Sequence, residues 1–390
     1  MTAFSVETRR PSDDRDPWWF VVDPLLIGAV GLITAIGSLL VYSATRGPAT
    51  DIDPANTSFL QRQLFFAALG VALAVATALV DIRRLRSFLG FGYAGLIVLL
   101  LGILRFGADI NGARAWYKFP GFTFQPSEPG KLVLIFALAA VFSSEDLGLS
   151  RLVLGLSAAG LPILLILKQP DLGTILVYVA ITAAVVLMSN IRVRYIILLL
   201  LAAVTVVTMV FQSDVLAKYQ KDRLTVFVLD DEAVDKLGAD AIRVAYNARQ
   251  SQIAIGNGGI NGEGLFQGTQ TSSNLVPEQQ TDFIFSVAGE ELGFRGAGLL
   301  LGLFGLVMFR IWRTAVRATD QFDRLLSVGV MAMFLFQVFQ SAGMTMGIMP
   351  VTGIPMPFVS YGGSSMLTSM VGVGLVLGVH RRRFDYATRS

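Results

Sequence analysis

The sequence predicts an all-α polytopic membrane protein with about ten transmembrane helices and a large extracytoplasmic loop before helix 8. Of its 390 residues 54% are apolar and only 15% are charged, whereas a soluble domain has roughly 25% charged residues. The apolar residues gather in runs close to the ~20 residues that a helix needs to cross ~30 Å of hydrocarbon. The connectors between the runs alternate between two kinds, short arginine-rich segments and segments with other polar residues. We therefore expect lipid to solvate most of the chain.

Ten apolar runs make up the predicted helices. The fourth run is short and is expected to begin earlier, near Gln125, and the eighth carries Glu290 and Glu291 and is expected to start above the membrane. The runs are Leu25–Ala44, Leu64–Val80, Phe88–Leu104, Lys131–Phe142, Leu152–Leu167, Leu172–Met188, Tyr195–Phe211, Phe283–Phe309, Leu325–Ile348 and Met366–Val379.

The arginines predict the orientation. Short connectors and the two terminal segments carry the basic residues Arg9, Arg10, Arg83, Arg84, Arg86, Arg192, Arg194, Arg310, Arg313, Arg317, Arg324 and Arg381–Arg383. Positively charged short loops stay in the cytoplasm, and an even number of helices leaves both termini on that side. We therefore expect a cytoplasmic segment at residues 1–24, a membrane domain at 25–380 and a cytoplasmic tail at 381–390.

The other connectors then face outward, and the largest runs from Gln212 to Asp282. It is far longer than an ordinary connection, and its segment Ala239–Ile255 has the spacing of an amphipathic helix. A glycine-rich turn region, Gly256–Gly264, follows that helix.

Several classes of function are excluded by composition. The chain has no cysteine and a single histidine, His380, which rules out disulfides, thiolate catalysis and a histidine zinc site. The net charge of +3 comes from basic residues spread between apolar runs rather than from a stripe, so nucleic acid is not an expected partner. No phosphate-binding Gly-Lys-Ser/Thr loop is present, so nothing indicates ATP hydrolysis.

Asp282 is the first candidate for chemistry, at the outer start of the eighth helix. One interpretation is structural: Thr281 caps the helix and the acid in its first turn favours the helix dipole. The other is a general base at the membrane boundary, where partial burial favours a pKa closer to neutrality.

Glu128 and Lys131 form the second candidate, three residues apart and therefore on one face of a helix. They form an interfacial ion pair with Lys131 reaching toward water, or they present a fixed cation to an anionic ligand. The intervening Pro129 and Gly130 argue against a regular helix here.

Other outward residues have both a structural and a functional interpretation. Asp171 caps a helix or contributes to a site, Arg223 is a solvated charge or an anion ligand, and Trp116 is an interfacial belt residue or a substrate contact. The segment Pro350–Ser365, which contains Ser360 and Tyr361, has three prolines and three glycines before Ser364. Such non-helical backbone at membrane depth must line a cavity or be buried in protein.

The motifs taken together resemble the SEDS family, that is RodA, FtsW and the sporulation homologue. The resemblance covers nearly the whole chain and is closest to the RodA branch in the segment Gly262–Gln270. It is carried by Asn111–Trp116, Gln125–Glu128, Gln169–Gly173, Ile255–Gly259, Thr281–Phe285, Glu290–Gly293 and Pro350–Ser365.

The resemblance implies a peptidoglycan glycosyltransferase of the bacterial cytoplasmic membrane. It would polymerise lipid II, the lipid-linked disaccharide-pentapeptide, at the outer face, beside a class B penicillin-binding protein, in cell elongation and shape. It assigns the essential aspartate to Asp282 and substrate contacts to Glu128, Lys131 and Trp116, and we add Arg223, Asp171, Ser360 and Tyr361 as substrate-binding candidates. Pro129–Gly130, and Gln280 where histidine is frequent, depart from the family pattern.

The chemistry requires a base for the acceptor hydroxyl and positive charge near the leaving diphosphate. Asp282 is the expected base, and Lys131, Arg223 or a divalent cation, Mg²⁺ or Mn²⁺, is expected at the diphosphate. No organic cofactor is expected, and the sequence does not identify metal ligands. Two other functions remain open at this point: a flippase or transporter for lipid II, and a non-catalytic scaffold for the transpeptidase.

Overall fold

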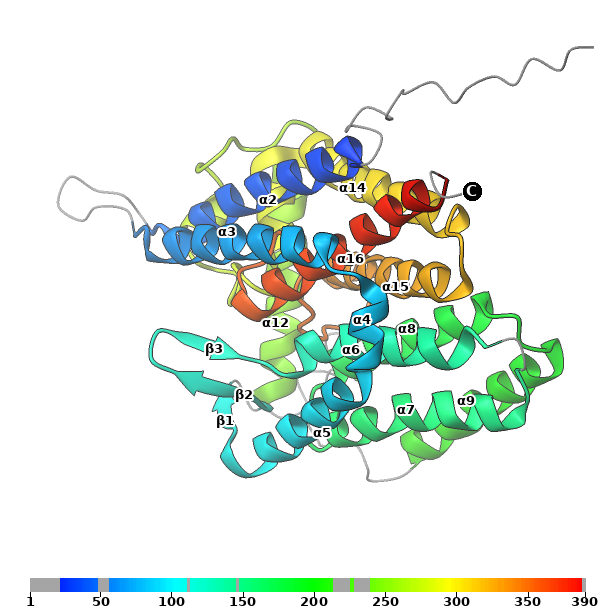
Figure 1. Cartoon of the computed structure of the whole chain (residues 1–390). Helices are drawn as coiled ribbons and strands as arrows, with labels where there is room; N and C mark the ends of the chain where they lie inside the picture. Colours follow the sequence, from blue (N-terminus) through cyan, green and yellow to red (C-terminus); the bar gives the residue numbers. More distant parts are fainter. Residues whose placement is uncertain are drawn as a thin grey trace, which may run out of the picture.

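The computed structural model describes residues 22–47, 56–110, 113–144, 147–212, 225–227 and 239–387. Its helices and strands are labelled in Figure 1. In chain order they are α2 (Pro24–Thr45), α3 (Ser58–Leu79), α4 (Ile82–Ser87), α5 (Leu89–Phe106), β1 (Ala108–Ile110), β2 (Ala113–Phe119), β3 (Phe122–Phe124), α6 (Ser127–Phe142), α7 (Leu149–Leu167), α8 (Leu172–Met188), α9 (Val193–Gln212), α12 (Ala239–Gly258), α13 (Thr269–Ser272), α14 (Ile284–Val316), α15 (Gln321–Thr345) and α16 (Gly363–Ala387).

The predicted fold class is confirmed. Each of the ten apolar runs falls on a helix, namely α2, α3, α5 to α9 and α14 to α16. Within the described residues, seven helices are long and apolar enough to cross a membrane, and α8, with 17 residues, is a shorter apolar helix. The fourth run begins at Ser127, close to the expected Gln125, because Pro126 precedes the first turn. The chain is therefore an integral membrane protein.

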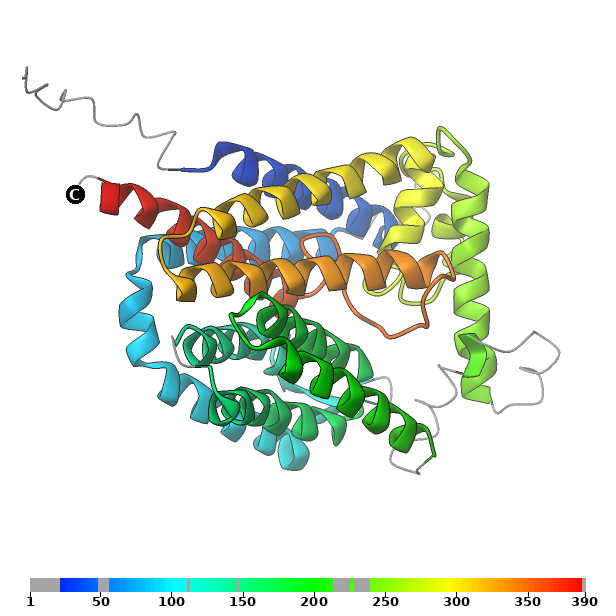
Figure 2. The ribbon, with the colours of Figure 1, turned by 90° about the vertical axis from the view of Figure 1, so that its right-hand side faces the viewer.

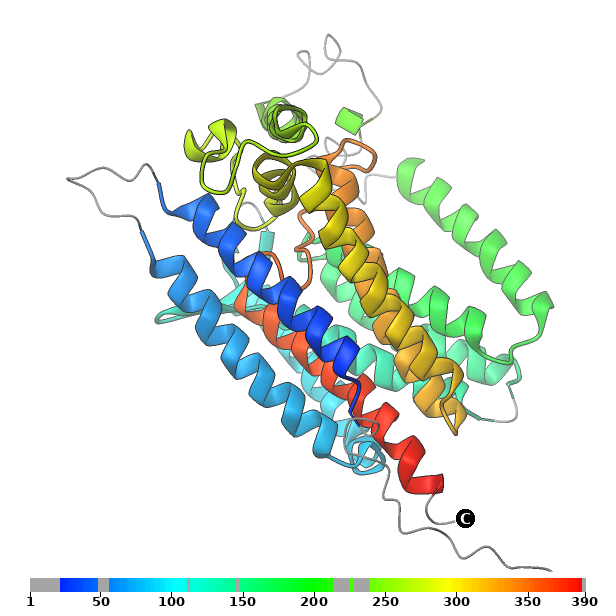
Figure 3. The same cartoon turned by 90° about the horizontal axis from the view of Figure 1, so that it is seen from above.

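The core of the bundle is built around α15 and α16. In the apolar stretch of α15 72% of the residues are buried, and in that of α16 67% are buried. The corresponding shares are only 22% in α3 and 17% in α5. Helix α15 packs on α14, α8, α6 and α16. Figure 3 shows α2, α3 and α16 running side by side. The backbones of α3 and α16 approach so closely that a Cβ at Gly374 would collide with the Ala74 carbonyl.

Helix α14 is two helices joined by a break at Gly293, whose backbone has φ 65° and ψ −170°. At the break, backbone N–H and C=O groups of α14 lose their helical partners, and residues of the glycine-rich turn region form hydrogen bonds with them instead. Gly264 N–H donates to the Glu291 carbonyl at 3.1 Å, and Phe294 N–H donates to the Gly259 carbonyl at 2.9 Å. A Cβ at Gly262 would collide with the Glu291 carbonyl, so the contact requires glycine. Figure 2 shows α12, the predicted amphipathic helix, lying across the end of the bundle where α14 begins.

The segment after α5, for which the sequence predicted no strand, forms a small antiparallel sheet. The sheet has the order β1-β2-β3, and Tyr117 pairs with Phe124 across β2 and β3. Phe119 and Phe122 stack with ring centroids 5.0 Å apart at the tight turn, where Gly121 has φ 85°. The alternation of side chains was too short to be recognised in the sequence.

The opposite end of the bundle holds the start of α2 and the end of α16, as Figure 2 shows. Two buried ion pairs lie there: Arg310 with Asp23 at 2.7 Å, and Arg382 with Asp323 at 2.6 Å. Arg310 and Arg382, which the sequence used only to predict orientation, therefore also form buried ion pairs. Each forms two or more hydrogen bonds to its aspartate, because a buried guanidinium needs a carboxylate partner.

Candidate functional site

The segment Pro350–Ser365 is the meeting point of the predicted site residues. It has no helix before Gly363. Its middle is buried at Val359, which packs so closely on α2 that a Cβ at Gly37 would lie 3.1 Å from the Val359 carbonyl. Of the two alternatives for this backbone, lining a cavity or being buried in protein, the second applies to its middle, from Met356 to Ser360.

Ser360 and Tyr361 hold the chain that leads to Asp282. The Ser360 hydroxyl donates to the Thr281 carbonyl at 2.6 Å and accepts from Met356 N–H at 2.8 Å. Tyr361 N–H donates to the Gln280 carbonyl at 2.9 Å. Two consecutive residues before Asp282 are therefore tethered to the Pro350–Ser365 segment.

Asp282 is partly buried and lies before α14 rather than in its first turn. The N-cap is Phe283, without a side-chain capping bond, and the Thr281 hydroxyl donates to the Glu278 carbonyl at 3.2 Å instead. The interpretation of Thr281 as the helix cap is therefore wrong. Glu278 has φ 55°, and its carbonyl accepts from Asp282 N–H at 3.1 Å, so a tight turn presents Asp282 at the end of the bundle.

Asp171 acts as a helix cap and also connects to the segment before α6. Its Oδ1 accepts from Thr174 N–H at 2.9 Å, which confirms the capping interpretation. Its Oδ2 accepts from the Thr174 hydroxyl at 2.7 Å and from the Gln125 amide at 2.9 Å. Gln125 N–H in turn donates to the Ser364 hydroxyl at 3.1 Å, so Asp171 joins the same meeting point.

Glu128 and Lys131 form a buried ion pair with 2.6 Å between Oε1 and Nζ. Helix α6 is regular here in spite of Pro129, because a proline in the first turn removes no helical hydrogen bond. Gly130 is needed since a Cβ there would collide with the Tyr178 hydroxyl, which donates to the Ser127 carbonyl at 3.0 Å. The expected reach of Lys131 toward water is wrong: the side chain is 1% exposed.

Two further candidates are less closely tied to this site. Trp116 lies half-buried in β2, and the sheet reaches α16 through β3, where Ser364 donates to the Thr123 carbonyl at 3.4 Å. Arg223 lies outside the described residues, as does Asn111.

The sequence pattern did not assign a role to Glu290 and Glu291, which are almost completely buried. Glu290 accepts from Gln270 N–H at 2.6 Å, from Thr271 N–H at 3.0 Å and from the Thr271 hydroxyl at 2.6 Å. The Ser43 hydroxyl donates to Glu291 Oε1. The signal in the sequence was the pair of acids inside an apolar run, where each charge requires partners.

The described part of the chain contains no group of three or more His, Asp or Glu side chains placed to hold a metal ion. Chemically, the site offers a carboxylate at a tight turn, a neutralised ion pair and a capped aspartate, all at the end of the bundle where α14 begins. Such an arrangement suits proton abstraction from a bound hydroxyl.

Comparison with known proteins gives consistent matches over nearly the whole chain. A family model described as cell cycle protein, covering FtsW, RodA and SpoVE, matches residues 23–384. The peptidoglycan glycosyltransferase MrdB of Escherichia coli (strain K12) is 33% identical over 368 residues, which are 93% of this chain and 94% of that protein.

Two solved structures have the same fold. One, from a study of the structural coordination of polymerization and crosslinking by a peptidoglycan synthase complex, has a TM-score of 0.77 and 32% identity over 94% of this chain and 100% of that chain. The other, the rod shape determining protein RodA of Thermus thermophilus, has a TM-score of 0.68 and 30% identity over 94% of this chain and 99% of that chain.

Proposed function

The chain belongs to the FtsW, RodA and SpoVE family and is a peptidoglycan glycosyltransferase, and we propose that it polymerises lipid II at the outer face of the bacterial cytoplasmic membrane with Asp282 as the general base. The observation that carries the base assignment is the tethering of Gln280 and Thr281 to Tyr361 and Ser360, which holds the Asp282 turn in place. A general base can take the proton only when it is held within hydrogen-bond distance of the acceptor hydroxyl, so its position must be fixed.

The donor sugar leaves as a lipid diphosphate, which is already a stable anion, so no strong general acid is needed. Direct displacement with one base inverts the anomeric carbon. Lys131 is buried and neutralised by Glu128, so this pair holds the start of α6 rather than meeting the diphosphate directly. For the diphosphate we propose Arg223 and a divalent cation, Mg²⁺ or Mn²⁺.

The proposed cation needs oxygen ligands. Without a cluster of three acids among the described residues, Mg²⁺ would be held through one or two carboxylates and the oxygens of the substrate phosphates. Removal of divalent ions with EDTA is expected to abolish polymerisation, and MgCl₂ in excess of the chelator is expected to restore it.

The relatives indicate the cellular setting. MrdB is named a peptidoglycan glycosyltransferase, and a structural neighbour comes from a peptidoglycan synthase complex that couples polymerization to crosslinking. We propose that this chain acts beside a class B penicillin-binding protein, which crosslinks the strands, and serves elongation and cell shape. Both termini are placed in the cytoplasm in this proposal, on the side of the Asp23–Arg310 and Asp323–Arg382 pairs.

The test is polymerisation of labelled lipid II by the purified chain together with its transpeptidase partner, in the presence of MgCl₂. Asp282→Asn keeps the size of the side chain and removes the base, so we expect polymer to fall by at least 10²-fold, the usual contribution of a general base. Glu278→Gln is the matched control, an exposed carboxylate in the same turn, and should retain polymerisation.

Two results would overturn the proposal. Polymer made by Asp282→Asn at the wild-type rate removes the base assignment. Lipid II that crosses vesicle bilayers without forming polymer, when the partner is present, establishes a flippase instead.

A further inference from the structure

The last turns of α14 carry a face of arginines. Arg310, Arg313 and Arg317 follow the i, i+3, i+7 spacing that places side chains on one side of a helix, and they are called the arginine face here. Arg383, near the end of α16, lies within electrostatic reach of these three guanidinium groups and of the Asp23 carboxylate. This cluster lies at the end of the bundle that holds the start of α2 and the end of α16 (Figure 2).

The carboxylate of Asp23 is already filled with donors. Its Oδ1 and Oδ2 accept from Arg310 Nε at 3.0 and 2.8 Å, and Oδ2 lies 2.7 Å from Arg310 Nη2. Its Oδ1 also accepts from Leu26 N–H at 3.1 Å, as the cap of α2. Asp23 therefore neutralises Arg310 and leaves the charges of Arg313 and Arg317 to be balanced by another group.

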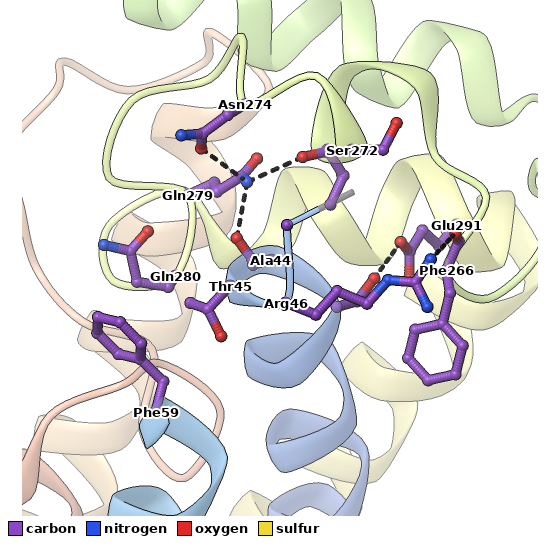
Figure 4. A pocket seen from close by; sticks show the side chains of 13 residues that line it. Ala44, Thr45, Arg46, Phe59, Phe266, Ser272, Asn274, Gln279, Gln280 and Glu291 are labelled. Atoms are coloured by element: carbon purple, nitrogen blue, oxygen red, sulfur yellow. Dashed lines mark hydrogen bonds between the residues drawn. The ribbon is translucent and has the colours of Figure 1, made fainter. Parts of the chain in front are cut away.

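The side chains of Arg313 and Arg317 make no ion pair or hydrogen bond with any described residue, and Arg313 is half-buried. Arg46, at the opposite end of α2 from Asp23, shows the contrast. It donates to the Phe266 carbonyl at 3.1 Å and lies 5.0 Å from the centre of the Phe266 ring (Figure 4). Like charges held together where water is partly excluded raise the free energy of a site, and a bound anion lowers it.

An apolar strip of α14 borders the arginine face. Its members, Phe309, Trp312 and Val316, directly precede the three arginines, so at roughly 100° per residue the two strips lie side by side. They are 51%, 48% and 59% exposed, and the ring centroids of Phe309 and Trp312 lie 6.0 Å apart. Tryptophan concentrates where a membrane meets water. The arginine face therefore lies at the level of the lipid headgroups, with a surface for acyl chains beside it.

We propose that the arginine face binds the phosphate headgroup of an anionic phospholipid in the leaflet on the side of the chain termini. Arg313 and Arg317, with Arg383 alongside, contact the phosphate oxygens, and an acyl chain lies along Phe309 and Trp312. A guanidinium group fits a phosphate with two parallel hydrogen bonds, and basic pockets between membrane helices bind such headgroups. A free phosphate ion offers the same oxygens but makes no use of the apolar strip. The inference does not depend on Asp282 or on the saccharide substrate.

The binding test uses the delipidated full chain in detergent and native mass spectrometry, with phosphatidylglycerol as the anionic probe and phosphatidylcholine as the neutral one. We expect phosphatidylglycerol to bind about tenfold more tightly or better. Arg313→Gln/Arg317→Gln should weaken its binding by a similar factor, because two charge-assisted contacts are lost. The matched control, Arg192→Gln/Arg194→Gln, removes two charges from exposed positions at the start of α9 and should leave binding unchanged.

Thermal unfolding separates binding from a structural role of the arginines. Phosphatidylglycerol should raise the melting temperature of the wild type, because the headgroup joins α14 to α16 across their like charges, and should not raise that of Arg313→Gln/Arg317→Gln. Without lipid, the double variant should be at least as stable as the wild type, since the side chains that it replaces repel Arg383. A lower melting temperature without lipid would indicate a structural role and contradict the inference.

Three outcomes of the binding experiment overturn the inference. Phosphatidylglycerol that binds no more tightly than phosphatidylcholine removes the anionic site. Equal losses in the two double variants show a general attraction of positive charge to the membrane rather than a site on α14. Displacement of phosphatidylglycerol by added inorganic phosphate assigns the arginines to a free anion instead of a lipid.

Discussion

At the scale of single residues, the site depends on polar groups whose partners are far away in the sequence. Lys131 and Glu128 are neighbours on one helix, but Asp171, Gln125 and Ser364 come from three different parts of the chain. Each of these groups is buried or partly buried. Loss of one partner therefore leaves the other without compensation in a medium of low dielectric constant.

The Glu128–Lys131 pair gives a prediction on stability. Lys131→Met leaves a buried carboxylate unpaired and should destabilise the fold by about 3–5 kcal/mol, whereas the double variant Glu128→Gln/Lys131→Met should recover much of that loss. Thermal unfolding in detergent measures both. A double variant no more stable than the single one would show that the pair is not coupled.

The Ser360 hydroxyl gives a prediction on activity. Ser360→Ala leaves Met356 N–H and the Thr281 carbonyl without their partner, which costs about 1–3 kcal/mol. The Asp282 turn loses a tether, so kcat for polymerisation should fall more than the melting temperature alone explains, and Ser360→Thr should restore it. Ser38→Ala is the control, because the Ser38 hydroxyl donates only within its own helix, to the Thr34 carbonyl.

At the scale of elements, the broken helix α14 determines the geometry of the end of the bundle where Asp282 lies. Its first part, from Ile284 to Leu292, begins next to Asp282 and carries Glu290 and Glu291. The glycine-rich region after α12 supplies the hydrogen bonds that the break would otherwise leave unmade. The break at Gly293 therefore separates this first part, with its two acids, from the longer remainder of α14.

Gly293 should not tolerate a side chain. A Cβ there would collide with Gly262 N, and φ of 65° with extended ψ is a region that only glycine adopts readily. Gly293→Ala should lower stability by about 1–3 kcal/mol and reduce polymerisation, measured by unfolding and by glycan length. Gly298→Ala in the same helix meets nothing within 4 Å and should be neutral. Equal effects of the two variants would contradict the role of the break.

At the scale of the whole molecule, the charged pairs and the start of α14 lie at opposite ends of the bundle. The Asp23–Arg310 and Asp323–Arg382 pairs lie at the end that holds the described ends of the chain, and α12 lies across the other. This separation matches the positive-inside arrangement of the arginines.

Cysteine labelling tests the orientation directly, because the wild-type chain has no cysteine. Ser273→Cys, exposed near α13, should react with a membrane-impermeant maleimide added to intact spheroplasts. Thr319→Cys, exposed between α14 and α15, should react only after the membrane is opened. The reverse pattern would contradict the proposed orientation.

Sequence alone was enough to predict the class of the fold and the positions of the ten helices. Hydropathy and the hydrogen bonds of a helix are local, so a run of apolar residues is enough to locate a span. The ion pairs of Arg310 and Arg382 and the hydrogen bond from the Gln125 amide to Asp171 were decided only by tertiary structure. Each depends on groups brought together from distant segments, and no local pattern records that.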